Sequence, residues 1–295
     1  MDEARYPSPA KINLGLRILG KRADGYHSIE TILHALDLYD WLSFRRTEDE
    51  GIRLSCSNPV LPTDERNLVT RAAGALQRAG HVRQGVEIHL DKRIPLAAGL
   101  GGGSSNAATT LLALNRLWGL QWDVTALHRE AVQLGSDVPF FLGGPAALAR
   151  GRGEELVPLP PGPPLRGVLV NPGFGVSAGW AYSQFDGRSH ATGDSMARIT
   201  AALARHELTA LAAAVVNDLE PGVARTHPVI GEMREALRAA GASVVFMSGS
   251  GPTLCGLFRD SAEAWRGASR LRERPPWAVM PFSTLSYSPL VERQG

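Results

Sequence analysis

The chain has 295 residues, of which 44% are hydrophobic and 20% charged, and its formal net charge is +2. This length is sufficient for a large buried core and allows two domains. A nearly balanced charge without a long basic run argues against a dedicated nucleic-acid-binding protein, and no apolar run is long enough to span a bilayer. The two cysteines, Cys56 and Cys255, lie far apart and form no C-x-x-C pair. They therefore fit a reducing compartment and offer no zinc site.

The first residues, MDEARYPSPAKINLGLRILG, carry acidic side chains where a signal peptide has a basic region. They also contain no apolar block of suitable length. We therefore expect a cytoplasmic protein whose partners include neither a membrane nor a nucleic acid.

The first third of the chain shows strand patterns and then a helix pattern. Apolar and polar residues alternate from Ala10 to Leu19, which predicts a strand with one buried face. Asp24-Gly25 is a strong turn signal. Further strands are expected within residues 29–45, 51–56 and 85–95. Apolar residues at helical spacing predict a helix from Asn67 to Ala79.

Two helices are expected next, from Asn106 to Leu117 and from Thr125 to Leu134, with Gly135 ending the second. After a proline-dense segment, residues 167–173 resemble a strand. Residues 199–216 and 228–240 show helical patterns, and residues 242–258 indicate two strands around a glycine turn. Strands and helices that do not alternate strictly predict an α+β fold.

The proline-dense segment from Leu156 to Gly167 is the best candidate for a linker. It divides the chain into an N-terminal domain of residues 1–165 and a C-terminal domain of residues 166–295. The alternative is a surface loop within one domain.

The stretch IPLAAGLGGGSSNAA, which begins at Ile94, places four glycines and two serines before a helix. Glycine lets the backbone approach a ligand closely, and a helix N-terminus presents unpaired N–H groups and a positive dipole end. Together they predict an anion site, usually for phosphate. Ser104 and Ser105 either donate hydroxyl groups or cap the helix, and the alternative is a flexible turn with a serine cap.

Other phosphate-binding motifs do not match. A Walker A motif needs Lys followed by Ser or Thr after its last glycine, whereas Ser104-Ser105 follows Gly103. A dinucleotide fingerprint that starts at Gly99 reaches Ser104 at its sixth position, where glycine is required. The motif set of protein kinases is also missing from the sequence.

PLAAGLGGGSSNAA resembles the loop of the GHMP kinases, which are named for galactokinase, homoserine kinase, mevalonate kinase and phosphomevalonate kinase. The segments PAKINLGL, RADGYHSIETI, GSDVPFFLGGPAA, NDLEP and GSGPTLCGLF also resemble motifs of that family, in the same order. RADGYH is similar to the substrate segment of a branch that recognises a cytidine group, and it is far more specific than the glycine loop.

The resemblance implies a two-domain GHMP kinase fold, with an N-terminal ribosomal-protein-S5-like domain and a C-terminal ferredoxin-like domain. It implies transfer of the γ-phosphoryl group of ATP to the tertiary 2-hydroxyl of a methylerythritol unit linked to cytidine diphosphate. One alternative is another small-molecule kinase of the family. A second is a non-catalytic nucleotide-binding protein, which the presence of Lys11 and Asp137 disfavours.

Two residues receive catalytic roles from the resemblance. Alone, Lys11 reads as a solvated strand residue, and Asp137 reads equally well as a helix N-cap before Pro139. The family motifs instead make Lys11 a lysine near the reacting hydroxyl, where its charge favours an alkoxide and an ionised Asp137. They make Asp137 the general base.

The substrate site is expected at Asn13, which can hydrogen-bond substrate or the catalytic pair, and at Tyr26 and His27. Tyr26 suits stacking on cytosine and His27 suits pairing with its polar edge. Tyr182 is the candidate for the opposite stacking face, with Trp180 and Phe185 as alternatives.

The resemblance places the ATP phosphates on the glycine loop and its flanks, formed by Pro95, Leu96, Ala97, Ala98, Gly99, Leu100, Gly101, Gly102, Gly103, Ser104 and Ser105. Mg²⁺ is expected with ATP. No cluster of metal ligands stands out in the sequence, and a loop serine is the expected protein contact. Residues 249–251 are either a turn near substrate phosphates or a plain hairpin turn.

Overall fold

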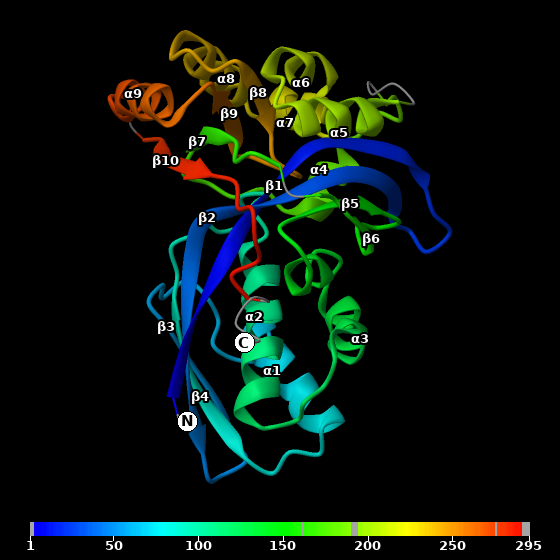
Figure 1. The fold of residues 1–295 in the computed structure, drawn as a ribbon, viewed down its shortest axis with the longest axis vertical. Helices are drawn as coiled ribbons and strands as arrows, with labels where there is room; N and C mark the ends of the chain where they lie inside the picture. The colour runs from blue at the N-terminus through cyan, green and yellow to red at the C-terminus, as the bar shows by residue number, and fades with distance from the viewer. Residues whose placement is uncertain (1–2, 161, 190–193, 275, 291–295) are drawn as a thin grey trace.

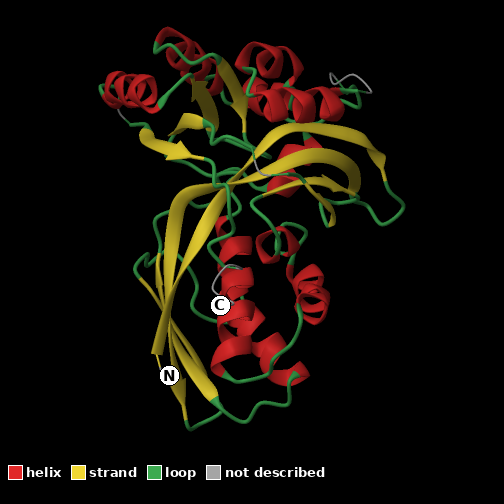
Figure 2. Cartoon of the chain, viewed as in Figure 1, coloured by secondary structure: helices red, strands yellow, loops and turns green. Residues whose placement is uncertain are grey.

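The computed structural model describes residues 3–160, 162–189, 194–274 and 276–290. The predicted α+β class is confirmed (Figures 1 and 2). The elements, in chain order, are β1 (Glu3–Lys21), β2 (His27–Thr47), β3 (Ile52–Cys56), α1 (Leu68–Ala79), β4 (Gly85–Asp91), α2 (Gly102–Leu117), α3 (Val124–Leu134), the 3₁₀ helix η1 (Pro139–Leu142), β5 (Ala146–Arg150), β6 (Glu155–Pro158), β7 (Arg166–Asn171), α4 (Ala178–Ser183), α5 (Ser195–Arg205), α6 (Leu208–Ala214), α7 (Glu220–Thr226), α8 (Val229–Ala239), β8 (Val244–Met247), β9 (Leu254–Phe258), α9 (Ser261–Arg272) and β10 (Ala278–Ser283).

A long antiparallel hairpin of β1 and β2 runs through both halves of the molecule (Figure 1). Its register shifts at Pro9/Lys11, Leu14/Leu16 and Ile18/Gly20, and such bulges bend strands. The expectation that β1 has only one buried face is wrong, because Lys11 and Asn13 on the polar face are 3% and 4% exposed. The glycine loop and the second half of the chain cover that face.

The first sheet is six-stranded, in the order β3-β4-β2-β5-β6 with β1 paired to β2. Helices α1 and α2 lie along one of its faces, and α3 packs against these two helices on the side away from the sheet (Figure 1). Their apolar residues meet those of the sheet in a core that includes Phe44, Leu76, Ile88, Leu111 and Phe140.

The second sheet is four-stranded and antiparallel, in the order β10-β7-β9-β8. Helices α8 and α9 pack on it through Met233, Leu237 and Leu271. Its other face shares a core with α5, α6 and the middle of β1, so the hairpin joins the two halves.

The chain returns to the first half after β10. Leu285 and Leu290 pack into the core around α2, and the Leu285 amide donates to the Ala35 oxygen at 2.9 Å. The first core is therefore completed by residues from the far end of the sequence (Figure 1).

Two helix predictions differ from the structure. Helix α2 begins at Gly102, four residues before the expected start at Asn106, so the last glycines and both serines belong to its first turns. The single helix expected over residues 199–216 is two helices, because His206 adopts a left-handed conformation with φ 55° and ends α5. Helices α4, α7 and α9 were not predicted from the sequence pattern.

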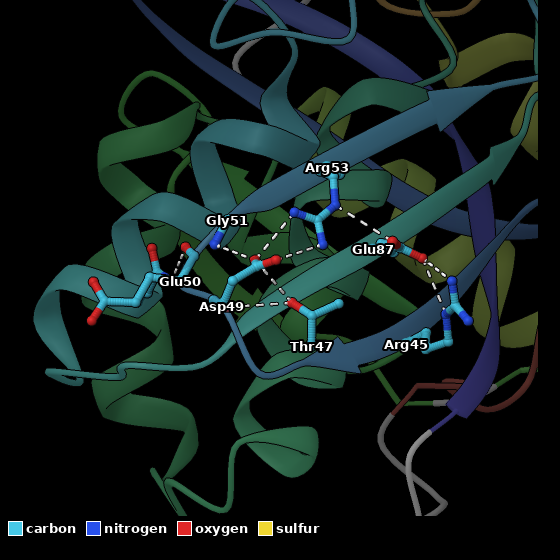
Figure 3. A network of polar contacts seen from close by, with 8 residues as sticks. Arg45, Thr47, Asp49, Glu50, Gly51, Arg53 and Glu87 are labelled. Atoms are coloured by element: carbon cyan, nitrogen blue, oxygen red, sulfur yellow. Dashed lines mark hydrogen bonds and ion pairs between the residues drawn. The ribbon is translucent and has the colours of Figure 1, made fainter.

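An exposed set of ion pairs, here called the outer ion network, crosses β2, β4 and β3 (Figure 3). It consists of Arg45, Asp49, Arg53 and Glu87. Arg45 and Arg53 lie in register with Glu87 from its two sides, and Arg53 also pairs with Asp49 at 3.0 Å. The network links these three strands at the end that lies far from the glycine loop.

Candidate active site

A cleft of about 1190 Å³ lies where the hairpin, the glycine loop and the second half of the chain meet. That volume suits a ligand larger than a simple metabolite. It brings together many of the residues singled out in the sequence, namely Lys11, Asn13, Tyr26, His27, Gly99, Gly101, Ser104, Asp137, Tyr182, Gly249 and Ser250.

Lys11 and Asp137 form an ion pair in this cleft, with Nζ and Oδ2 3.3 Å apart. The Lys11 side chain is 4% exposed and the Asp137 side chain 35%. Lys11 Nζ also donates to Asn13 Oδ1 at 2.5 Å and to the Gly99 oxygen at 3.2 Å. The ammonium is thus held on three sides, while the carboxylate keeps an open side toward the cleft. Asp137 is not the N-cap of the following helix, since Val138 occupies that position.

Asn13 is fixed by a chain of hydrogen bonds. Its Nδ2 donates to Thr31 Oγ1 at 3.0 Å, and Thr31 donates to the Gly15 oxygen at 2.5 Å. The backbone N–H of Asn13 donates to Ser248 Oγ at 3.2 Å, and the Ser248 hydroxyl donates to the Gly99 carbonyl oxygen at 2.9 Å. Both glycine segments of the sequence are therefore tied to the same β1 residue.

The glycine loop packs backbone against backbone on the 248–251 turn. A Cβ at Gly99 would clash with the Ser248 oxygen, and the φ of Gly99 is +75°. Gly101, with φ 69°, is the N-cap of α2 and supplies no side-chain cap. The helix therefore presents uncapped N–H groups beside the cleft, which is the arrangement that attracts anions.

The alternative that a serine caps α2 is wrong, because Ser104 and Ser105 lie inside the helix. Ser104 faces the cleft, whereas Ser105 is fully buried and its hydroxyl accepts a hydrogen bond from Ser8 at 2.8 Å. Ala98 and Leu100 point into the core. Pro95, Leu96, Ala97, Gly102 and Gly103 are not among the described residues that line the cleft.

Aromatic side chains line the opposite end of the cleft. The His27 and Tyr182 rings are stacked, with centroids 5.2 Å apart and planes at 14°, and Phe185 meets His27 edge-on. Tyr26 is 56% exposed. Trp180 instead packs against His227 and lies outside the cleft lining. Partial burial, followed by the charge of Lys21, lowers the pKa of His27.

The structure adds Arg152, which sequence reasoning missed. Its guanidinium lies 5.0 Å from the centroid of the Tyr26 ring, and its Nε donates to Glu154 at 3.3 Å. It contributes a positive charge to the aromatic end of the cleft. Its segment, RGRGEE, carries no distinctive pattern, so only the fold reveals its place.

Hard oxygen donors are present where a metal–nucleotide would lie. The Ser104 hydroxyl and the Asp137 carboxylate both face the cleft, and oxygen ligands are those that Mg²⁺ prefers. Within residues 3–160, 162–189, 194–274 and 276–290, no cluster of three or more His, Cys, Asp or Glu side chains is suited to a metal. No helix in that part of the chain is long and apolar enough to cross a bilayer.

Comparison with known proteins gives two family matches. Residues 67–145 match the GHMP kinases N terminal domain and residues 199–276 match the GHMP kinases C terminal domain. The chain is 47% identical to 4-diphosphocytidyl-2-C-methyl-D-erythritol kinase of Pelotomaculum thermopropionicum over 89% of this chain and 92% of that protein. It is 44% identical to the enzyme of the same name from Moorella thermoacetica, over 95% and 99%.

Solved structures agree. A crystal structure of 4-(cytidine 5'-diphospho)-2C-methyl-D-erythritol kinase is 36% identical, with a TM-score of 0.80 over 95% of this chain and 99% of that one. A homoserine kinase from Cytophaga hutchinsonii has a TM-score of 0.79 over 98% and 96%, but at 20% identity this likeness shows the fold alone. The two-domain GHMP kinase fold expected from the sequence is confirmed.

Proposed function

We propose that this chain, which belongs to the family of 4-diphosphocytidyl-2-C-methyl-D-erythritol kinases, transfers the γ-phosphoryl group of ATP to the 2-hydroxyl of 4-diphosphocytidyl-2-C-methyl-D-erythritol. The observation that carries the proposal is one cleft in which the Lys11–Asp137 pair lies between an uncapped helix N-terminus and an aromatic end. In this proposal the enzyme acts in the cytoplasm.

Asp137 acts as the general base in this mechanism. Its carboxylate accepts the proton of the substrate hydroxyl as the oxygen attacks the γ-phosphorus, and the bond to the β-phosphate oxygen of ADP breaks. Lys11 pairs with this carboxylate and stabilises negative charge on the attacking oxygen. Because phosphoryl transfer passes through a loose transition state, positioning by the Lys11 contacts to Asn13 and Gly99 matters as much as proton removal.

The phosphates of ATP are assigned to the N-terminus of α2 and the Gly99–Gly101 backbone. The uncapped N–H groups and the helix dipole favour their negative charge. The Ser104 hydroxyl is the protein group that would hold Mg²⁺, which would neutralise phosphate charge.

The cytosine ring is assigned to the aromatic end. The stacked His27 and Tyr182 rings leave no room for a base between them at 5.2 Å, because a base in contact with both would separate them by about 7 Å. In this arrangement Tyr182 supports the imidazole from behind. The base then lies on the exposed Tyr26 ring and pairs its polar edge with His27.

Phosphorus NMR tests the reaction. The purified protein is incubated with MgATP and 4-diphosphocytidyl-2-C-methyl-D-erythritol, beside parallel samples with mevalonate and homoserine. A new phosphomonoester signal in the first sample alone is the expected result. A product from mevalonate or homoserine would support a kinase activity but overturn the assignment of the cytosine site. No product in any sample would overturn the enzymatic proposal.

Asp137→Asn tests the base. We expect turnover to fall by about 10²–10⁴-fold while MgATP still binds, because the amide keeps the shape but cannot take the proton. Asp123→Asn is the matched control. Asp123 caps α3 by accepting from Ala126, which asparagine does equally well, so its turnover should match wild type. Wild-type turnover in Asp137→Asn would remove this residue from the base role.

A further inference from the structure

A buried group of polar side chains lies behind the glycine loop. This group, here called the inner ion network, consists of Ser8, Asp40, Lys92, Ser105 and Asn106, all of which are buried. None of the five is among the described residues that line the cleft. They join β1, β2, the end of β4 and the first turns of α2.

Asp40 is the centre of the network, and its side chain is 0% exposed. Its Oδ1 accepts from the backbone amides of Arg93 at 2.7 Å and Ile94 at 2.8 Å. Its Oδ2 accepts from Lys92 Nζ at 2.7 Å and from Asn106 Nδ2 at 3.0 Å. One carboxylate thus takes four hydrogen bonds from residues 52 to 66 positions away along the chain.

Lys92 brings its ammonium under the start of α2. Its side chain is 4% exposed, and Nζ also donates to the Ile94 oxygen at 2.6 Å. A Cβ at Gly102 would lie 3.1 Å from this Nζ, so the ammonium lies close to the first residue of the helix. Lys92 therefore lies beside both ends of the glycine loop, at Ile94 where the loop begins and at Gly102 where it ends.

Asn106 ties the exit of the loop to the same carboxylate. Its Nδ2 donates to Asp40 Oδ2 and to Ser8 Oγ at 2.9 Å, and Ser8 donates to Ser105 Oγ. The backbone from Ile94 to Gly102 is consequently clamped at both ends, while its middle faces the cleft through Gly99 and Gly101.

We propose that Asp40 is a positioning residue, which sets the spacing between the two ends of the glycine loop and so pre-forms its phosphate-binding backbone. The reason is geometric, because the four donors of Asp40 come from residues that directly precede the loop and from the helix that directly follows it. The inference rests on the proposed function, in which the phosphates of ATP lie on this loop. It predicts that loss of the clamp weakens nucleotide binding and leaves the aromatic end unaffected.

Calorimetric titration of Asp40→Asn tests the proposal below the unfolding temperature of the variant. The two ligands are the β,γ-imido analogue of ATP with Mg²⁺ and, separately, 4-diphosphocytidyl-2-C-methyl-D-erythritol. We expect the Kd of the nucleotide to rise about tenfold or more, and the Kd of the cytidyl substrate to stay within about twofold. Glu87→Gln, in the outer ion network, is the matched control and should alter neither.

Asn106→Leu removes only the tie at the exit of the loop and keeps the Asp40–Lys92 pair. It should weaken the nucleotide in the same direction, which tests the clamp even where Asp40→Asn does not fold. An unchanged nucleotide Kd in Asn106→Leu, or an equal loss for both ligands in either variant, would overturn the positioning role. A wild-type protein that binds the cytidyl substrate but no magnesium nucleotide would overturn the proposed function, and this inference with it.

Discussion

The two ends of β4 carry ion networks with opposite surroundings. The outer network is open to solvent, with side chains 36% to 64% exposed in the Arg45–Glu87 pair (Figure 3). The inner network is closed, with Lys92 and Asp40 4% and 0% exposed. Hydrogen bonds to Glu87 and to Asp49 raise the pKa values of Arg45 and Arg53, whereas burial lowers the pKa of Lys92 against the opposing effect of Asp40.

The difference shows how burial changes what an ion pair does. Exposed pairs gain little because water already solvates both charges. A buried pair repays its desolvation only where every hydrogen-bonding group is satisfied, and the loss of one partner leaves an uncompensated charge. In the inner network, the Asp40 carboxylate is satisfied by two backbone amides and by Asn106 in addition to Lys92. These bonds fix the relative positions of the segments that carry the donors.

The largest effect is expected from breaking the inner pair. Lys92→Met should lower the free energy of unfolding by about 3–5 kcal/mol, because Asp40 then stays buried without its counterion. The double variant Lys92→Met/Asp40→Asn should lose less than the sum of the single variants, by about 1–3 kcal/mol. Urea unfolding of all four proteins measures this coupling. Strict additivity would show that the two charges do not depend on each other.

A pH titration probes another buried polar side chain of β2, His34. His34 is 9% exposed, and burial lowers its pKa to about 4. Above pH 6.5 the imidazole is neutral in both states. Below it, only the unfolded state takes up the proton, so stability falls as the pH falls and levels off below about 4. The contribution amounts to about 3 kcal/mol in total.

The measurement is the free energy of unfolding of wild type and His34→Gln between pH 7 and pH 4. As the pH falls, the free energy of unfolding of the wild type should decrease more steeply than that of His34→Gln. His89→Gln, at an exposed position of β4, should reproduce the wild-type profile. Parallel profiles for wild type and His34→Gln would contradict the assignment.

The smallest effect is expected in the outer network. Glu87→Gln should leave stability nearly unchanged, and any small loss should shrink further as salt is added, because exposed pairs are screened. Unfolding at low and high ionic strength checks this. A large, salt-independent loss would show that the contrast between the two ends of β4 is wrong.

The sequence predicted those parts of the site that local motifs carry. Lys11, Asn13 and Asp137 stand in short motifs, and the cleft brings them together, although their roles stay proposals. Asp40 was missed because it lies in the apolar run LDLYDWLSF and all its partners are more than fifty residues distant. The break at His206 was missed for a similar reason, since nothing in the helical pattern there marks a left-handed residue.

The return of residues 284–290 to the first half has a consequence for synthesis on the ribosome. The first sheet and its helices are complete in sequence by Pro158, yet Leu285 and Leu290 belong to their core. At translation rates of roughly 5–20 residues per second, the last two leucines of this core are synthesised about 7–26 s after Pro158. During that interval the surface they later cover faces solvent, and it is there that we expect a nascent chain to be most open to chaperones.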